Sequence, residues 1–146
     1  MKRFMKKLFL VLAVAIMAVA CSMDGDERND FVLAFILVER VEMPDYVVPG
    51  NTYPVNMYFR RPTDCYYVQP EPYYSIFGDT RTVAVQALVI EDSDCQPVEA
   101  TRPDDVKTFN FQCPLTTAQS FTFKFYKGND AQGNQQFIEV VVPVQQ

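Results

Sequence analysis

The sequence predicts an all-β domain, an antiparallel β-sandwich, on the basis of three observations. From residue 31 onward, apolar side chains recur at every second position, which is the period of a half-buried strand. Groups of Pro, Gly, Asn and Asp separate these alternating segments and indicate turns. We find no helical periodicity after the first 20 residues. Short alternating segments joined by turns are typical of two packed antiparallel sheets.

Six to eight strands are expected between residues 31 and 146. Residues 31–41 are almost entirely apolar, which predicts a strand buried on both faces or at a sheet centre. In residues 53–59, Tyr53, Val55, Met57 and Phe59 alternate with other side chains. Pro54 lacks a backbone N–H and belongs at a strand start or an edge. Further strands are predicted around residues 83–89, 97–100, 109–113, 121–125 and 138–144, with an irregular stretch at 61–80, a turn at 91–94 and a hairpin connection at 128–134.

The alternation also predicts which side chains form the core. The inward positions are Val83, Val85, Ala87, Val89, Phe109, Phe111, Cys113, Phe121, Phe123, Phe125, Ile138, Val140, Val142 and Val144. The strand order, with a long second-to-third connection and a closing hairpin, resembles immunoglobulin-like domains. This resemblance spans residues 31–146 and implies an immunoglobulin-like β-sandwich, although the chain lacks the tryptophan of antibody domains.

The first 21 residues resemble the export signal of a bacterial lipoprotein. A basic start at residues 2–7 precedes an apolar run, Leu8 to Ala20, and the small residues Ala18-Val19-Ala20 stand directly before Cys21. A cysteine at this position resembles a lipobox, whose thiol receives a diacylglycerol before cleavage. Lipoboxes usually carry Leu where this chain has Ala18, and ordinary signal peptidase would also accept the Ala-x-Ala pattern. The apolar run is shorter than the roughly 20 residues that an uncleaved membrane span needs.

Residues 21–30 are expected to form the lipidated cysteine and a flexible tether, because residues 22–30 are polar and acidic and carry few apolar side chains. An acidic patch after the lipidated cysteine resembles the signal that sends Bacteroidota lipoproteins to the outside of the outer membrane. The whole chain is similar to small surface lipoproteins of that group. This similarity implies export, a lipid anchor in the outer membrane and a location at the cell surface.

Charge and composition exclude several classes of function. Residues 1–20 hold four of the 13 basic residues and none of the 18 acidic ones, so residues 21–146 carry a formal charge of −9. An acidic surface repels phosphates, and we therefore expect no nucleic-acid partner. The chain has no histidine, which excludes histidine-based triads, general bases and zinc ligands. We expect no catalytic site, no cofactor and no metal.

Three cysteines follow Cys21, so one pair and one free thiol are expected in an oxidising compartment. Cys113 continues the inward pattern of its strand and is predicted to be buried. Cys65 and Cys95 each follow an aspartate at a loop-like position, which favours a disulfide between them. The pairings of Cys113 with either one remain open.

The candidate binding site is an aromatic loop within residues 65–77. Loops on a rigid β-scaffold often bind ligands, and tyrosine offers a stiff contact area with a polar tip. The alternative is that several of these rings cap the core. Acidic groups at residues 91–94, at Asp104 and Asp105 and at Asp130 suggest calcium, but they lack an aligned ligand pattern and are expected to be solvated. The candidate binding residues are Tyr66, Tyr67, Tyr73, Tyr74 and Phe77.

The sequence thus favours a cell-surface lipoprotein with a non-catalytic binding or interaction domain. Its lipid would hold it to the membrane, and its partner would be a glycan or an envelope protein. The alternative is an accessory or structural subunit of an envelope assembly, such as a transport complex or a fimbria-like polymer. In that case exposed strand edges, which another chain can pair with, would matter more than the tyrosines.

Overall fold

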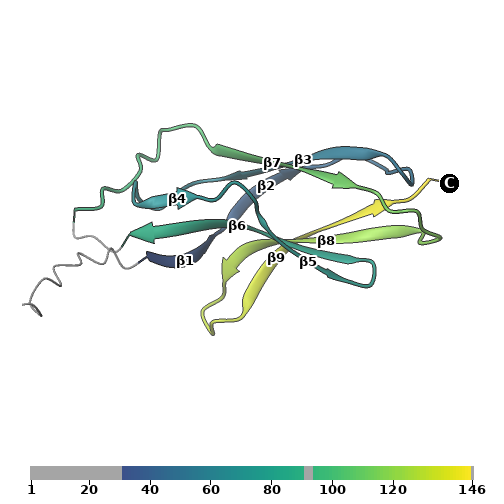
Figure 1. The fold of residues 1–146 in the computed structure, drawn as a ribbon. Coiled ribbons are helices and arrows are strands. Elements are labelled where there is room, and N and C mark those ends of the chain that lie inside the picture. Colours follow the sequence, from purple (N-terminus) through teal and green to yellow (C-terminus); the bar gives the residue numbers. More distant parts are fainter. Residues whose placement is uncertain (1–30, 91–93, 146) are drawn as a thin grey trace, which may run out of the picture.

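The computed structural model describes residues 31–90 and 94–145, and these residues form an all-β sandwich, as the sequence predicts (Figure 1). No helix occurs in this part of the chain, hence none of a kind that could cross a membrane. The predicted leader at 1–20, Cys21 and the tether lie outside the described residues. The strands are β1 (Phe31–Ile36), β2 (Val38–Glu42), β3 (Thr52–Phe59), β4 (Tyr66–Val68), β5 (Tyr73–Phe77), β6 (Thr80–Ile90), β7 (Asp105–Gln112), β8 (Ser120–Asn129) and β9 (Gln135–Pro143).

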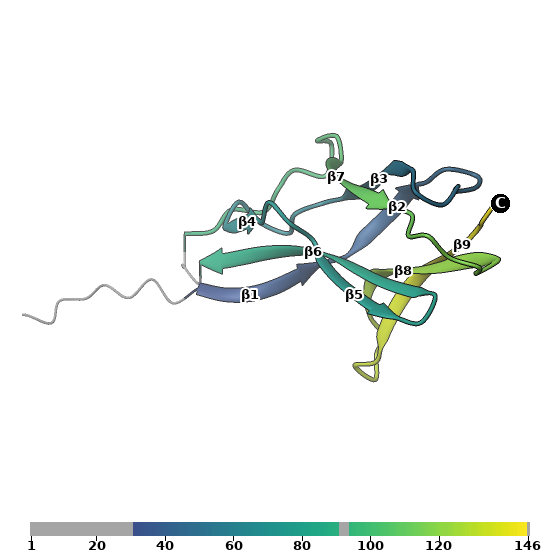
Figure 2. The same ribbon diagram turned by 45° about the vertical axis from the view of Figure 1, so that its right-hand side comes forward.

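Two sheets make up the sandwich (Figures 1 and 2). The larger sheet has six strands in the order β1-β6-β8-β9, and β4 and β5 pair with the two halves of β6. The smaller sheet has the order β2-β3-β7. All strand pairs are antiparallel except β6 with β8, which are parallel over Thr80–Val83 and Thr122–Phe125. The expectation of a purely antiparallel sandwich is therefore wrong at this pair, where the chain enters from the other sheet.

Side chains of both sheets fill the core between them, and most of the predicted inward faces are confirmed. Phe121, Phe123 and Phe125 of β8 are buried, and β-branched valines of β6 pack beside them. Such residues favour strands because they pack well on a pleated surface. In β9, Val142 is buried, and Ile138 packs against the core. The period-two pattern therefore located the interior of the sandwich.

The first predicted strand differs from the expectation in two ways. The strand is interrupted at Leu37, so that β1 belongs to the six-stranded sheet and β2 to the three-stranded sheet (Figure 2). In addition, β1 is not buried on both faces, because Phe31, Leu33 and Phe35 are exposed. These alternate residues point to the outer face of the six-stranded sheet.

Two other predicted segments also differ. The stretch at 61–80, expected to be irregular, contains β4 and β5, both paired with β6. Residues 97–100, expected to be a strand, form only an isolated bridge between Pro97 and Thr63.

The predicted hairpin connection joins β8 to β9, and Asp130 accepts hydrogen bonds there from the backbone N–H groups of Gln132 and Asn134. Of the predicted turn at 91–94, residues 91–93 lie outside the described residues.

Candidate functional site

The five aromatic residues that the sequence singled out lie on two strands at one edge of β6, not in a loop. Tyr66 and Tyr67 belong to β4, and Tyr73, Tyr74 and Phe77 belong to β5. The prediction that these residues form a loop is therefore wrong, and their role in binding stays a prediction. The tyrosines are strand-forming residues whose backbone pairs with β6, and the prolines between the two short strands hid this pattern.

Alternation along β4 and β5 divides these five residues between two faces. Tyr66 packs against the core, as the alternative reading predicts, and Tyr74 lines the space between the two sheets. The other three, Tyr67, Tyr73 and Phe77, occupy the opposite face of their strands and lie on the outer face of the six-stranded sheet. The structure thus places the predicted residues on two opposite faces of these strands.

An aromatic row crosses the outer face from β5 to β9. The ring centroids of Tyr73 and Phe35 lie 5.3 Å apart, and those of Phe35 and Tyr126 lie 5.9 Å apart. Tyr126 and Phe137 complete the row at 6.4 Å. Neighbouring rings are inclined by 52–71° to one another. Ala84 lies opposite Tyr73 on the same face and is 1% exposed, because these rings cover it.

Exposed apolar side chains also lie on both sides of the aromatic row, separated from it in part by polar residues of β5, β6 and β8. Leu33, two positions before Phe35 in β1, is 56% exposed, and Phe77 at the end of β5 is 87% exposed. Exposed apolar patches on a protein surface often mark interaction sites. The outer-face cluster consists of Phe31, Leu33, Phe35, Tyr67, Tyr73, Phe77, Tyr126, Phe137 and Val141.

The charged groups beside the aromatic row neutralise each other. Lys124 of β8 forms a 2.8 Å ion pair with Glu139 of β9, and its ammonium lies 5.8 Å from the ring centroid of Phe137. A polar row, formed by Ser75, Thr82, Lys124 and Glu139, thus crosses the face between the aromatic row and the end that carries Phe77 and Val141. Sequence reasoning missed Phe35, Tyr126 and Phe137. The sequence did contain one indication of this surface. Residues 31–37 carry bulky apolar side chains on both faces of the strand, although a strand in a sandwich buries only one face in the core.

A second feature is a cleft lined by residues of β5 and β7. The ribbons of these two strands, one from each sheet, are labelled in Figures 1 and 2. The volume of the cleft is about 650 Å³, within the range of small-molecule sites. Aromatic rings form much of its wall, and the rings of Tyr74 and Phe109 meet edge to face at 5.8 Å. The remaining wall includes Pro70, Pro72, Ile76 and Phe111, together with Arg81 of β6.

Arg81 is the one charged side chain that is buried among the described residues, at 6% exposure. Its Nη1 donates hydrogen bonds to the backbone carbonyls of Gly78 at 2.7 Å and Thr80 at 3.1 Å. The guanidinium carbon lies 4.8 Å from the ring centroid of Phe121. Burial raises the pKa of the Tyr74 hydroxyl, and the nearby Arg81 partly opposes this effect. Within residues 31–90 and 94–145, no carboxylate forms an ion pair with Arg81.

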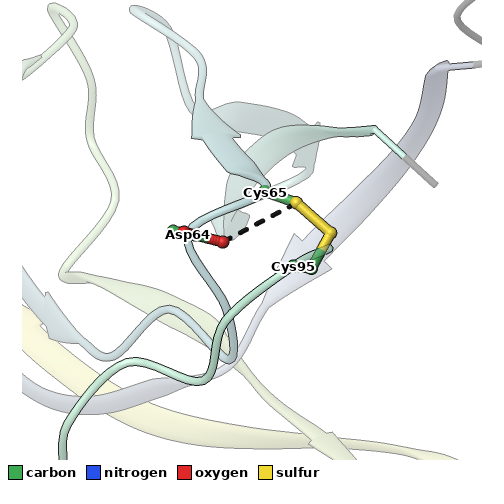
Figure 3. Close-up of side chains that lie close together, drawn as sticks. All are labelled: Asp64, Cys65 and Cys95. Carbon is green, nitrogen blue, oxygen red and sulfur yellow. Dashed lines mark hydrogen bonds between the residues drawn. A yellow bond between two sulfur atoms is a disulfide. The ribbon is translucent and has the colours of Figure 1, made fainter. Parts of the chain in front are cut away.

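The structure contains the disulfide that the sequence favoured, Cys65 to Cys95, which closes a separation of 30 residues. It joins the start of β4 to the segment after β6 (Figure 3). Asp64 lies beside it, with Oδ1 3.7 Å from the sulfur of Cys65, and accepts a hydrogen bond from the backbone N–H of Gln96. Both sulfurs are bonded to each other, so this group of possible metal ligands is not a thiolate site in the oxidised protein.

The third cysteine, Cys113, is free and buried in the core, as predicted. Burial raises the pKa of its thiol, and the positive charge of Arg81 opposes this shift. A thiolate is the reactive form of cysteine, so this environment disfavours nucleophilic chemistry. Cys113 is therefore a structural residue.

The acidic pair Asp104 and Asp105 is engaged by arginines and not simply solvated. Asp104 forms a 2.7 Å ion pair with Arg60, and Asp105 pairs with Arg61 at 2.9 Å and with Arg102 at 3.2 Å. These contacts tie the end of β3 to the start of β7. The expectation of solvated carboxylates is wrong here, because the register of β3 and β7 brings both arginines to the two aspartates.

Comparisons with protein-family models, with curated proteins and with solved structures found no match to this chain. The assignment of function therefore depends on the residues and geometry described above.

Proposed function

We propose that this protein is an exported, lipid-anchored envelope protein whose immunoglobulin-like β-sandwich is a non-catalytic interaction module. The outer-face cluster carries the proposal. It exposes aromatic and aliphatic side chains on one sheet face, with the nearby charges of Lys124 and Glu139 neutralised. Burying such a surface against a partner is favourable, at about 25 cal/mol for each Å² of apolar area.

The shape of the cluster favours a protein partner over a free glycan. A sugar ring stacks on a flat aromatic face, whereas the rings of the aromatic row are inclined by 52–71° to their neighbours. Leu33 adds an exposed aliphatic side chain on β1, and Val141 adds another on β9, beyond Glu139. An uneven surface of inclined aromatic rings and aliphatic side chains resembles the apolar centre of protein interfaces, where aromatic anchors fill pockets of the partner.

The anchor is supported by the sequence before the sandwich. Cys21 is ten positions before Phe31, the first residue of β1, so an extended tether spans at most about 35 Å. A lipid on Cys21 would therefore hold the sandwich, and the β1 part of the outer-face cluster, close to a membrane surface. Two or more acyl chains give stable anchoring, because each buried methylene contributes about 0.8 kcal/mol.

An envelope assembly is the second candidate, and one observation favours it. Among the described strands, β5 pairs only with β6, and β7 pairs only with β3. Each strand thus has one edge without a partner strand, and such an edge can pair with a strand of another subunit. In that case the binding partner would contact the β5 or β7 edge, and substitutions on the outer face would leave the assembly intact.

The interaction is tested by placing a charge on the outer face. Leu33→Asp should reduce recovery of a stoichiometric membrane partner by about tenfold or more, because a carboxylate would be buried in an apolar contact. Val106→Asp is the matched control, since Val106 is 52% exposed on β7 of the other sheet. The measurement is quantitative mass spectrometry after affinity capture from native membranes. Equal recovery by wild type and both variants would exclude the outer face, and loss with Val106→Asp alone would favour the strand edges.

The lipid anchor is tested separately. We expect the mature protein to begin at Cys21 and to carry the added mass of a diacylglycerol, with or without a further acyl chain, in intact-mass spectrometry. Cys21→Ser should remove this mass and release the protein from the membrane fraction. A wild-type chain that begins at Cys21 without acyl groups would instead indicate cleavage by ordinary signal peptidase, and the anchor would be rejected.

A further inference from the structure

The geometry points to a second binding site, which goes beyond the outer-face interaction: the cleft between β5 and β7 binds an organic carboxylate with an apolar body, and Arg81 pairs with the carboxylate. The two sites are independent. Arg81 lies on the inner side of β6 at the position that pairs with Ile76 and Phe123, whereas the aromatic row occupies the opposite face of the same sheet.

Arg81 carries a buried positive charge that forms no ion pair among the described residues. Burying a cation without a counter-charge is unfavourable, and buried arginines are usually paired. Arg81 has only neutral neighbours in the contacts described: two backbone carbonyls, the Tyr74 hydroxyl and the face of Phe121. A bound anion would supply the counter-charge that Arg81 lacks.

The geometry of the guanidinium suits a carboxylate ligand. It has five N–H donors arranged to match a carboxylate in a bidentate pair. The hydrogen bonds of Arg81 to Gly78 and Thr80 both leave from Nη1 and fix the side chain beside the cleft. The donors on Nε and Nη2 are not used in these two bonds. Tyr74, on the same wall, adds a hydroxyl that can donate to a second oxygen.

The walls define the rest of the ligand. Tyr74, Phe109 and Phe111 offer aromatic surface, and two prolines add a rigid apolar rim. A volume of about 650 Å³ is much more than a carboxylate alone occupies, so the site suits an aryl or alkyl group attached to it. Such a ligand could be a small aromatic acid or the C-terminal residue of a peptide, whose backbone could pair with the open edge of β5 or β7.

Glu71 brings a negative charge to the wall of the cleft. It does not form an ion pair with Arg81 among the described contacts. Its carboxylate should repel an incoming anion across the opening of the cleft. Glu71→Gln is therefore expected to strengthen carboxylate binding by a few-fold, and to leave the binding of a neutral ligand unchanged.

The test uses calorimetric titration of the full-length chain in detergent with N-acetylphenylalanine and its amide. We expect the acid to bind at least about tenfold more tightly than the amide. Arg81→Gln should abolish this preference, whereas Arg40→Gln, an equal charge change on β2, should retain it. A short peptide ending in phenylalanine, free or amidated at its C-terminus, distinguishes a peptide source from a small acid: tighter binding of the free-acid peptide than of N-acetylphenylalanine would indicate the peptide.

Several results would overturn the inference. Equal affinities for acid and amide, or no heat from the acid at millimolar concentration, would show that the cleft does not recognise a carboxylate. Inorganic phosphate binding as tightly as the acid would show a general anion site. If Arg81→Gln does not fold, Arg81→Lys and Glu71→Gln decide the question: the first should weaken acid binding, because a lysine cannot make a bidentate pair, and the second should strengthen it. No change in either variant would reject the proposal.

Discussion

Replacing Phe123 with alanine should lower the free energy of unfolding by about 3–5 kcal/mol. Phe123 is 0% exposed in β8, its ring centroid lies 5.0 Å from that of Phe111 of the opposite sheet, and it stacks on Phe125 at 6.1 Å. The substitution removes apolar contacts on both sheets and leaves a cavity where they meet. Urea denaturation, followed by circular dichroism, measures the change.

Phe77→Ala is the control for this substitution, because it deletes the same group from a site that is 87% exposed. It should change the free energy of unfolding by less than about 0.5 kcal/mol. Equal losses in the two variants would show that the described core does not contain Phe123. A decrease in binding without a decrease in stability for Phe77→Ala would agree with its place in the outer-face cluster.

Removal of the disulfide by the double substitution Cys65→Ala and Cys95→Ala should lower stability by about 3–4 kcal/mol. The bond closes a separation of 30 residues, and its loss increases the conformational entropy of the unfolded chain. The measurement is urea denaturation of both proteins with and without a reducing agent.

The reducing agent supplies the control for this experiment. It should lower the stability of the wild type to that of the double variant, and it should leave the double variant unchanged, because Cys113 is free in both cases. A wild type that is insensitive to reduction, although its sulfurs are shown to be reduced, would contradict the expected stabilisation. Cleavage mapping of the oxidised protein would detect any pairing with Cys113.

The parts of the fold that sequence reasoning predicted correctly are those in which one face of a strand is buried and the other is not. Phe121, Phe123 and Phe125 alternate with polar residues, and the structure buries all three. The same pattern placed Cys113 in the core and left the other two cysteines to pair. Alternation is sufficient to predict the buried face of these strands, because it depends only on which side of the strand faces the core.

The parts that could not be predicted depend on contacts between distant segments. Residues 31–36 are apolar on both faces, and composition cannot distinguish a strand covered by its own chain from one that exposes Phe31, Leu33 and Phe35. The tyrosines were recognised as candidates, but only pairing with β6 determines which of them face outward. Arg81 resembles an ordinary charged residue in the sequence, and its burial follows from its place beside the opening between two sheets.

The change of sheet at Leu37 has a mechanical consequence. A single run of chain forms β1, hydrogen-bonded to β6 in one layer, and β2, hydrogen-bonded to β3 in the other. Tension applied at the amino end would therefore load the β1–β6 ladder first, and the β2–β3 ladder only after β1 has detached. Complete detachment of this segment would remove one strand from each of the two sheets.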